Sequence, residues 1–303
     1  MSLTLEIQKE LTRPSERVKS LDVHPSQPWI LASLHSGNIF IWNYQSQAMV
    51  NSLEVAQLPV RSAKFVTSQQ WIVTGADDGQ IRIYNYNTTH KVKEFEAHTD
   101  FIRCIVVHPT LPYLLSSSDD QLIKLWDWKK DWACTRVFKG HSHYAMQVAF
   151  DPKDTETFAS ASLDGSVKLW KLSSPTPSGT LKGHSKGVTC IEFFTDEGKP
   201  CLISGSDDYT AKVWDRETKI CVKTLEGHTN NVTAVCVHPE LPILITASED
   251  ETVRVWHATT YELVNTLSYG LRRAWAIGCI KDSHRVVLGY DEGTIVIKVK
   301  ADL

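Results

Sequence analysis

Short alternating runs of apolar and polar residues, separated by turn residues, make up most of the chain. The stretch from Glu226 to His257 shows the pattern: an alternating run beginning at Val232, a His-Pro-x-x-Pro segment, a second apolar run, an acidic turn and a third run ending at Trp256. Runs of this length bounded by Pro, Gly and Asp predict β-strands. Three strands fit in this stretch, and the segment Tyr261–Leu267 supplies a fourth.

The same pattern recurs along the chain at a fixed spacing. Residues equivalent to Trp256 are separated by 42 or 44 residues, and they are Trp42, Tyr84, Trp126, Trp170, Trp214, Trp256 and Lys298. A period of this length with four strands per unit is typical of a β-propeller blade. One blade cannot bury both of its faces alone. The seven equivalent positions therefore predict an all-β, seven-bladed propeller that forms a single domain over residues 1–303.

The two ends of the chain are expected to meet in the last blade. Blade one is predicted at 17–54 and blade two at 59–96, but the last repeat provides only three strands, at 273–280, 285–289 and 294–299. The alternating run Leu3–Ile7 precedes the first complete blade. We expect it to add the fourth strand of the last blade, because this closes the ring and removes an open edge.

Three segments depart from the regular repeat. Ser173–Ser178 and Thr195–Pro200 are predicted to be surface loops, since they are rich in Ser, Pro, Gly and charged residues. The segment 127–140 contains Trp128 and Trp132 beside two lysines, and we interpret it as an outer strand and hairpin rather than as a functional aromatic cluster.

Composition narrows the possible functions. The net charge of −3 and a pI near 6.5 give no overall attraction to nucleic acid or to an anionic membrane. The seven cysteines are scattered without a CxxC pair, so they are expected to be reduced core residues rather than metal ligands or disulfides. The N-terminus resembles no signal peptide, and no run approaches the ~20 apolar residues of a membrane span. We expect a cytoplasmic protein without cofactor, metal or membrane insertion.

Ser, His and Asp recur in phase with the repeat. The pairs Ala97-His98, Gly140-His141, Gly183-His184 and Gly227-His228 place the chain close to the WD-repeat family, which it resembles over essentially its whole length. The resemblance implies that each His bonds to the aspartate six residues before the reference position and to a strand hydroxyl. These aspartates are Asp78, Asp120, Asp164, Asp208 and Asp250. Because a catalyst needs one such set and a scaffold needs one in every blade, we expect a structural role and no enzyme activity.

Function is expected where equivalent positions differ between blades. At the entrance to each inner strand, five residues before the His of His-Pro or its equivalent, lie in blade order Lys19, Arg61, Arg103, Met146, Thr189 and Thr233. Just before the structural aspartates lie His35, Asp77, Asp119, Leu163, Asp207, Glu249 and Asp291. Three cations thus occupy one arc of a rim on which acidic residues are common. They either neutralise Asp77 and Asp119, or they repel one another until an anionic ligand binds.

Several strings resemble a narrower family, the amino-terminal propellers of the coatomer β′ subunit. They include RVKSLDVHPSQPW (17–29), PVRSAKF (59–65), FEAHTDFIRCIVVHPTLPYLLSSSDD (95–120) and LGYDEG (288–293). The resemblance implies a module of the COPI vesicle coat on Golgi membranes. Such a module binds C-terminal dilysine signals, KKxx or KxKxx, on cytosolic tails of membrane cargo returning to the endoplasmic reticulum. It also implies a longer subunit, of which this chain is an excised N-terminal domain, with other coatomer subunits contacting regions outside it.

The resemblance also assigns roles to residues. Lys19 and Arg61, assisted by Arg103, would hold the terminal carboxylate of the peptide, and Asp100 and Asp119 would receive its lysines. Further peptide contacts are expected from Arg17, His35, Asp77 and Asp207. His35 stands where close relatives often have Tyr, and its imidazole is expected to titrate near neutral pH. The alternative function is a general WD-repeat scaffold for an unrelated protein partner, with rim charges that serve folding or solubility.

Overall fold

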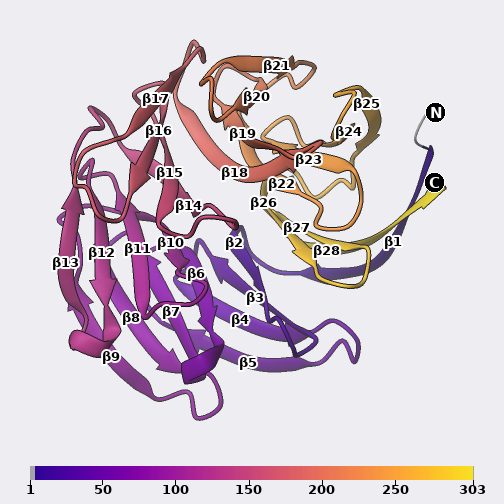
Figure 1. Cartoon of the computed structure of the whole chain (residues 1–303). Helices are drawn as coiled ribbons and strands as arrows, with labels where there is room; N and C mark the ends of the chain where they lie inside the picture. The colour runs from indigo at the N-terminus through magenta and orange to yellow at the C-terminus, as the bar shows by residue number, and fades with distance from the viewer. Residues whose placement is uncertain (1–3, 303) are drawn as a thin grey trace.

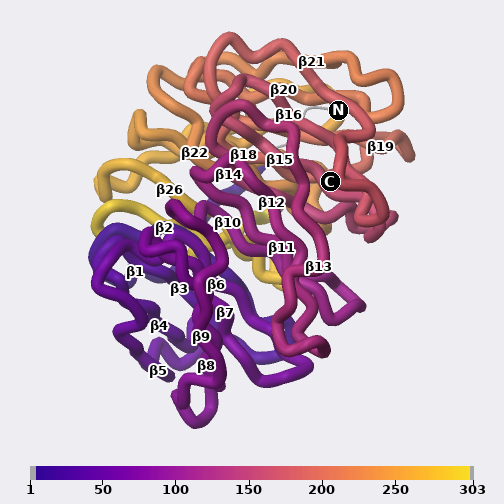
Figure 2. Tube along the Cα trace, turned by 90° about the vertical axis from the view of Figure 1, so that its left-hand side faces the viewer, coloured from indigo at the N-terminus to yellow at the C-terminus, as the bar shows by residue number. Residues whose placement is uncertain are grey.

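The computed structural model describes residues 4–302, which form a seven-bladed β-propeller (Figure 1). Seven four-stranded antiparallel sheets contain all 28 strands, and two short 3-10 turns occur at Thr67–Gln69 and Trp128–Lys130. Six sheets follow the order of the chain from the inner to the outer strand. The view turned by 90° places the outer strands β5, β13 and β21 toward the periphery (Figure 2).

The strands of the first two blades lie within the predicted boundaries, and blades three and four repeat the arrangement. They are β2 (Val18–Val23), β3 (Trp29–Leu34), β4 (Asn38–Asn43), β5 (Met49–Glu54); β6 (Val60–Val66), β7 (Trp71–Ala76), β8 (Gln80–Asn85), β9 (Lys91–Glu96); β10 (Ile102–Val107), β11 (Tyr113–Ser118), β12 (Ile123–Asp127), β13 (Ala133–Phe138); β14 (Ala145–Phe150), β15 (Thr157–Ser162), β16 (Ser166–Lys171) and β17 (Gly179–Lys182).

The last three blades repeat the same arrangement. Their strands are β18 (Val188–Asp196), β19 (Lys199–Ser206), β20 (Ala211–Asp215), β21 (Cys221–Leu225); β22 (Val232–Val237), β23 (Ile243–Ser248), β24 (Val253–His257), β25 (Leu263–Leu267); β26 (Ala274–Ile280), β27 (Arg285–Tyr290), β28 (Gly293–Asp302) and, from the start of the chain, β1 (Thr4–Pro14).

The predicted closure by the N-terminal strand is confirmed. The seventh sheet has the order β1-β28-β27-β26, with Ile7 opposite Val299. The strand is longer than the predicted run, of which Leu3 lies outside the described residues. It continues to Pro14 after a register shift between Lys9 and Leu11.

The second half of β1 is rich in polar side chains, so the pattern of alternating apolar residues does not predict it as a strand. Within that half, Glu10 forms an ion pair with Arg285, at 2.5 Å between Oε2 and Nε. Such a pair across two strands stabilises a stretch that hydrophobicity alone does not predict.

One predicted loop is wrong. The segment Thr195–Pro200 is mostly strand, because β18 and β19 continue past the other blades with Thr195 opposite Pro200 and Asp196 opposite Lys199. Only Glu197 and Gly198 form the turn. The extension is fastened to the neighbouring blade, since the Tyr261 hydroxyl donates to Asp196 Oδ2 at 2.6 Å. The other predicted loop, Ser173–Ser178, lies between β16 and β17 as expected.

The tryptophan-rich segment 127–140 forms a hairpin that leads into the outer strand β13, as predicted. It contains the end of β12, the second 3-10 turn and β13. The ring of Trp132 is buried and lies 5.8 Å from Trp71, 5.9 Å from Phe95 and 5.9 Å from Trp128 between centroids. These rings join blades two and three, which accounts for the aromatic residues without a binding role.

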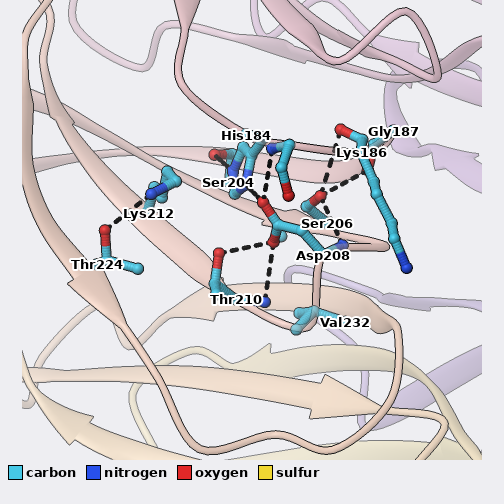
Figure 3. A network of polar contacts seen from close by, with 12 residues as sticks. His184, Lys186, Gly187, Ser204, Ser206, Asp208, Thr210, Lys212, Thr224 and Val232 are labelled. Atoms are coloured by element: carbon cyan, nitrogen blue, oxygen red, sulfur yellow. Dashed lines mark hydrogen bonds and ion pairs between the residues drawn. The ribbon is translucent and has the colours of Figure 1, made fainter.

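The repeated His, Asp and hydroxyl residues form the network that the family resemblance implies. In blade five, His184 Nδ1 lies 2.8 Å from Asp208 Oδ2 and its Nε2 lies 2.8 Å from Ser204 Oγ (Figure 3). The indole N–H of Trp214 donates to the same hydroxyl at 2.8 Å. Equivalent networks centred on His98, His141 and His228 occur in blades three, four and six. They satisfy buried polar groups beneath the turn between the second and third strands.

Blade two departs from this pattern, so the expected role of Asp78 is wrong. No His lies in the segment 55–59 that leads into β6, and Asp78 pairs instead with Arg82, at 2.6 Å between Oδ2 and Nη2. The Thr74 hydroxyl donates to the Arg82 carbonyl at 3.2 Å. An ion pair within the blade thus replaces the histidine network.

The inner strands form the wall of the central channel, and each has one edge without a partner strand. Side chains from the preceding blade bond to the free N–H groups on these edges. Asp22 Oδ2 accepts from the Phe65 N–H at 2.8 Å, and Ser62 Oγ accepts from the Ile105 N–H at 3.0 Å. Glu192 Oε2 accepts from the Val237 N–H at 2.8 Å. Polar residues on the channel wall therefore join neighbouring blades, as buried backbone groups require.

Glu192 should make the stability of the domain depend on pH. Burial raises the pKa of this carboxyl from its usual value to about 7, with the hydrogen bond from Val237 acting in the opposite direction. Between about pH 4.5 and 7 the folded state then binds a proton that the unfolded state has released, so the free energy of unfolding falls as pH rises. Each pH unit in this window costs roughly 1.4 kcal/mol.

The substitution Glu192→Gln should remove this dependence. Relative to the parent protein, the variant should gain stability as the pH rises from 5 to 8, measured by urea unfolding at both values. Other titrating groups are common to both proteins, so they cancel in the difference. A difference between the two proteins that is equal at pH 5 and pH 8 would show that Glu192 is ionised throughout.

Candidate functional site at the mouth of the central channel

A cavity of 470 Å³ opens at the centre of the ring, and all seven inner strands contribute to its wall. The structure brings together the three cations of the sequence register, since Lys19 in β2, Arg61 in β6 and Arg103 in β10 all line this cavity. Asp207 lines it from blade five. The cavity is therefore the place where the expected contrast between cations and carboxylates is realised.

Two of the three cations are already paired with carboxylates. Arg103 bonds to Asp119 through two contacts of 2.6 Å, and Arg61 bonds to Asp77 through Nη2 at 2.7 Å and also through Nε. The carboxylate side chains are only 4% and 5% exposed. For these two arginines, the structure contains the neutralising pairs that the sequence analysis considered as one alternative.

Lys19 differs from the two arginines. Within residues 4–302 no carboxylate forms an ion pair with it, and its ammonium lies over the face of Trp275, 4.4 Å from the ring centroid. Burial, followed by repulsion from Arg61, Arg17 and Arg103, lowers the pKa of Lys19 to about 8. An anion beside Lys19 would relieve this repulsion, so the cavity favours a negatively charged ligand group at this point.

Trp275 was missed by the sequence analysis, although it occupies the equivalent of the Lys19 position in blade seven. Its indole N–H donates to Asp291 Oδ1 at 2.7 Å. Asp291 also accepts from Arg17 Nε at 2.6 Å and from Arg273 Nε at 2.9 Å. Extending the register by one blade would have found this tryptophan, whose face is a favourable surface for a cation.

Aromatic rings also cover the paired arginines. The guanidinium of Arg61 lies 5.3 Å from the centroid of Phe101, and that of Arg103 lies 5.8 Å from Phe101 and 5.7 Å from Tyr144. These contacts hold the two arginines in fixed positions at the cavity. Sequence reasoning gave no signal for them, because the rings come from the segments that precede β10 and β14 rather than from the repeat positions compared.

The opposite arc of the cavity carries no cation at the equivalent positions. The Thr189 and Thr233 hydroxyls instead donate to backbone carbonyls of the next inner strand, at 2.5 Å and 2.6 Å. Asp207 has no cationic partner among the described residues, and burial followed by repulsion from Glu249 raises the pKa of its carboxyl. This arc therefore favours a positively charged group.

The remaining predicted residues lie around the cavity rather than in its wall. Asp100 is exposed in the segment before β10, and its Oδ1 accepts from the Phe101 N–H at 2.8 Å. Arg17 and His35 line an adjacent depression of 390 Å³ together with Asp291. The structure thus brings together Lys19, Arg61, Arg103 and Asp207, with Asp77 and Asp119 behind the arginines.

The expected titration of His35 near neutral pH is not supported. Partial burial, followed by the charges of Lys19, Arg17 and Arg61, lowers the pKa of His35 below its usual value of 6.5. The imidazole is therefore neutral at pH 7. It adds hydrogen-bonding capacity to the rim and no positive charge.

Within the described part of the chain, no three His, Cys, Asp or Glu side chains gather in an arrangement that could hold a metal ion. In the same residues, no helix has the length and apolar character needed to cross a membrane.

Comparisons with known proteins agree with this architecture. Residues 17–297 match the family model of the IFT122 first β-propeller. The chain is 74% identical over 299 residues to coatomer subunit β′-2 of Oryza sativa subsp. japonica, 66% identical over 303 residues to coatomer subunit β′-1 of Arabidopsis thaliana, and 62% identical over 299 residues to coatomer subunit β′ of Homo sapiens. These alignments cover at least 99% of this chain and 33% of each relative.

The chain thus spans about a third of the length of the curated relatives it matches. The matched family model covers nearly the whole repeat region, and the relatives extend the similarity to both ends of the chain. The chain belongs to the family of WD-repeat β-propellers described by the IFT122 first-propeller model, and within it the chain is similar to coatomer β′ subunits.

Proposed function

We propose that this propeller is a cargo-recognition module of the COPI coat, part of a longer coat subunit that acts in the cytoplasm on Golgi membranes and vesicles. Its ligands are C-terminal dilysine signals, KKxx or KxKxx, on cytosolic tails of membrane proteins. The observation that carries the proposal is the unpaired Lys19 ammonium in a cavity whose opposite arc holds the unpaired carboxylate of Asp207. A peptide with an anionic end and basic side chains complements this distribution of charge.

The terminal carboxylate of the peptide binds at Lys19, with Arg61 and Arg103 completing the positive arc. Arginine presents five N–H donors, so each guanidinium retains donors after its bonds to Asp77 or Asp119. The carboxylate also relieves the mutual repulsion that lowers the pKa of Lys19. In this arrangement Asp77 acts by orienting Arg61.

The lysines of the signal bind at carboxylates around the rim. Asp100 is the most open of these, since it is exposed and its carboxylate, among the described residues, accepts a hydrogen bond from the adjacent Phe101 N–H alone. Asp119 retains lone pairs beside its bidentate contact with Arg103, although its side chain is almost fully buried. Arg17, His35 and Asp207 supply further contacts along the peptide.

The arginine ion pairs favour a second candidate function, a general protein-interaction scaffold. Arg61 with Asp77 and Arg103 with Asp119 are the contacts expected if the rim charges only stabilise a general protein-interaction scaffold. Within residues 4–302 neither Lys19 nor Asp100 forms an ion pair, so these two residues separate the two functions more clearly than the arginines do.

The substitution Lys19→Met should weaken binding of a KxKxx peptide at least tenfold, because a charge-assisted hydrogen bond contributes on the order of 1.5–3 kcal/mol. Isothermal titration calorimetry with a free-acid peptide and with its C-terminal amide checks this. The amide should bind weakly to the parent protein and equally weakly to the variant. Lys223→Met on the outer strand of blade five makes the same change of charge and should leave the affinity unchanged.

Equal affinity of Lys19→Met and the parent protein for the free-acid peptide would contradict the proposed carboxylate site. Failure of the parent protein to bind any dilysine peptide would instead favour the general scaffold. The affinity for the peptide should also decrease with salt, as the Debye length falls from about 10 Å at 0.1 M to about 3 Å at 1 M.

A further inference from the structure

Two thiols from neighbouring blades lie in contact in the channel wall. Cys236 belongs to β22 and Cys279 to β26, and their sulfur atoms are 3.1 Å apart. Every cysteine in the described residues is a free thiol. The two sulfurs need to approach by only about 1 Å to reach the ~2.05 Å of a disulfide bond.

The two cysteines lie on strands that share no backbone hydrogen bonds. Strand β22 pairs with β23, and β26 pairs with β27, so the two inner strands belong to different sheets. Cys236 is buried, whereas Cys279 is only partly buried. A bond between them would therefore link blade six covalently to blade seven, the blade that the two chain ends close.

We propose that Cys236 and Cys279 form an oxidation site, a pair of thiols that a peroxide converts into a disulfide between blades six and seven. The more exposed Cys279 thiolate attacks a peroxide oxygen, so an S–O bond forms, the O–O bond breaks and one water leaves when the peroxide is hydrogen peroxide. The Cys236 sulfur then attacks the sulfur of this sulfenic acid, the S–S bond forms and a second water leaves. Overall, two thiols lose two electrons and two protons to one peroxide.

Glu192 can act as the proton acceptor for the second step. Its Oε2 accepts from the N–H of Val237, the residue that follows Cys236 on β22, at 2.8 Å, so the carboxyl lies close to the thiol. The hydrogen bond with Cys279, together with burial, raises the pKa of the Cys236 thiol, which suits it to the second step rather than to the first attack. Transfer of the Cys236 thiol proton to Glu192 generates the Cys236 thiolate while the sulfenic acid of Cys279 is in contact with it.

The bond would constrain the unfolded chain by closing the segment between residues 236 and 279. A loop of this size stabilises a folded domain and should raise the melting temperature by roughly 3–6 °C. Because a thiol reductant reverses a disulfide by exchange, dithiothreitol should return the melting temperature to its original value.

The experiment treats the folded protein with a small excess of hydrogen peroxide, removes the oxidant and counts thiols in denaturant. The count should fall from seven to five with a loss of 2 Da, which is the mass of two hydrogens, and peptide mapping should find Cys236 linked to Cys279. Cys236→Ser and Cys279→Ser should each lose the linked peptide and the increase in melting temperature. Cys221→Ser, at a partly buried cysteine on an outer strand, should retain both.

Six remaining thiols, with oxidation confined to the exposed Cys134, would overturn the proposal. So would a link that maps to other cysteines, or stepwise gains of 16 Da without a link, which indicate sulfenic and sulfinic acids on separate residues. Thiol counting and peptide mapping on the parent protein test whether the Cys236–Cys279 disulfide forms even if a serine variant fails to fold.

Discussion

Removing residues 1–13 should abolish cooperative unfolding of the domain and leave a protein that aggregates. Strand β1 pairs with β28 from Thr4 opposite Asp302 to Pro14 opposite Gly293, and Leu5 and Ile7 pack against the core between blades six and seven. Without β1, the edge of β28 presents unpaired N–H and C=O groups together with an uncovered apolar surface, which is a template for pairing with other chains. Calorimetry and size-exclusion chromatography measure the two effects.

A matched control separates the strand from its exposed side chains. Glu6 and Lys9 are exposed on β1, so the double variant Glu6→Ala, Lys9→Ala retains the backbone pairing. Surface substitutions of this kind usually change stability by about 0.5 kcal/mol or less. The control should melt like the parent protein and remain monodisperse. A truncated protein with the parent melting temperature and solubility would show that β1 is dispensable.

The fold was predictable because the same strand and turn pattern recurs in several blades. Each reference residue, such as Trp126 or Trp214, recurs with the same turns around it, so errors in one blade are corrected by the others. Two predictions of strand boundaries failed, both at places where the chain departs from the repeat. The second half of β1 and the hairpin beyond Thr195 are held by polar contacts with distant residues, Arg285 and Tyr261 respectively. Such contacts between positions far apart in the sequence are invisible to a local pattern.

The site was predictable in its composition but only partly in its contacts. Comparing equivalent positions found Lys19, Arg61 and Arg103, and the structure brings these residues to one cavity. The comparison did not reveal that Arg61 and Arg103 engage carboxylates while Lys19 does not. Ion pairing depends on side-chain reach and burial rather than on position in the repeat. The sequence analysis missed Trp275 beside Lys19 because the comparison of equivalent positions considered only charged residues.

The substitution Trp170→Ala should destabilise the domain by about 3–5 kcal/mol, measured by urea unfolding, as expected for removing a large buried side chain. Trp170 is fully buried, stacks on Phe158 at 5.9 Å between centroids and contacts Phe138 at 5.8 Å. Its N–H donates to Ser160 Oγ at 2.8 Å, and that hydroxyl lies 2.6 Å from His141 Nε2. A loss below about 1 kcal/mol would mean that the blade collapses into the space without cost.

A comparison with blade one should divide this cost between packing and hydrogen bonding. Trp42 occupies the equivalent position, but Ala32 stands in place of the serine, and the buried Trp42 N–H has no hydrogen-bond partner among the described residues. Trp42→Phe and Trp170→Phe remove the same volume, whereas only the second leaves a buried hydroxyl without its donor. Trp170→Phe should therefore cost about 1–3 kcal/mol more than Trp42→Phe. Equal losses in urea unfolding would mean that the Ser160 bond adds nothing and that the repeated tryptophan is retained for packing alone.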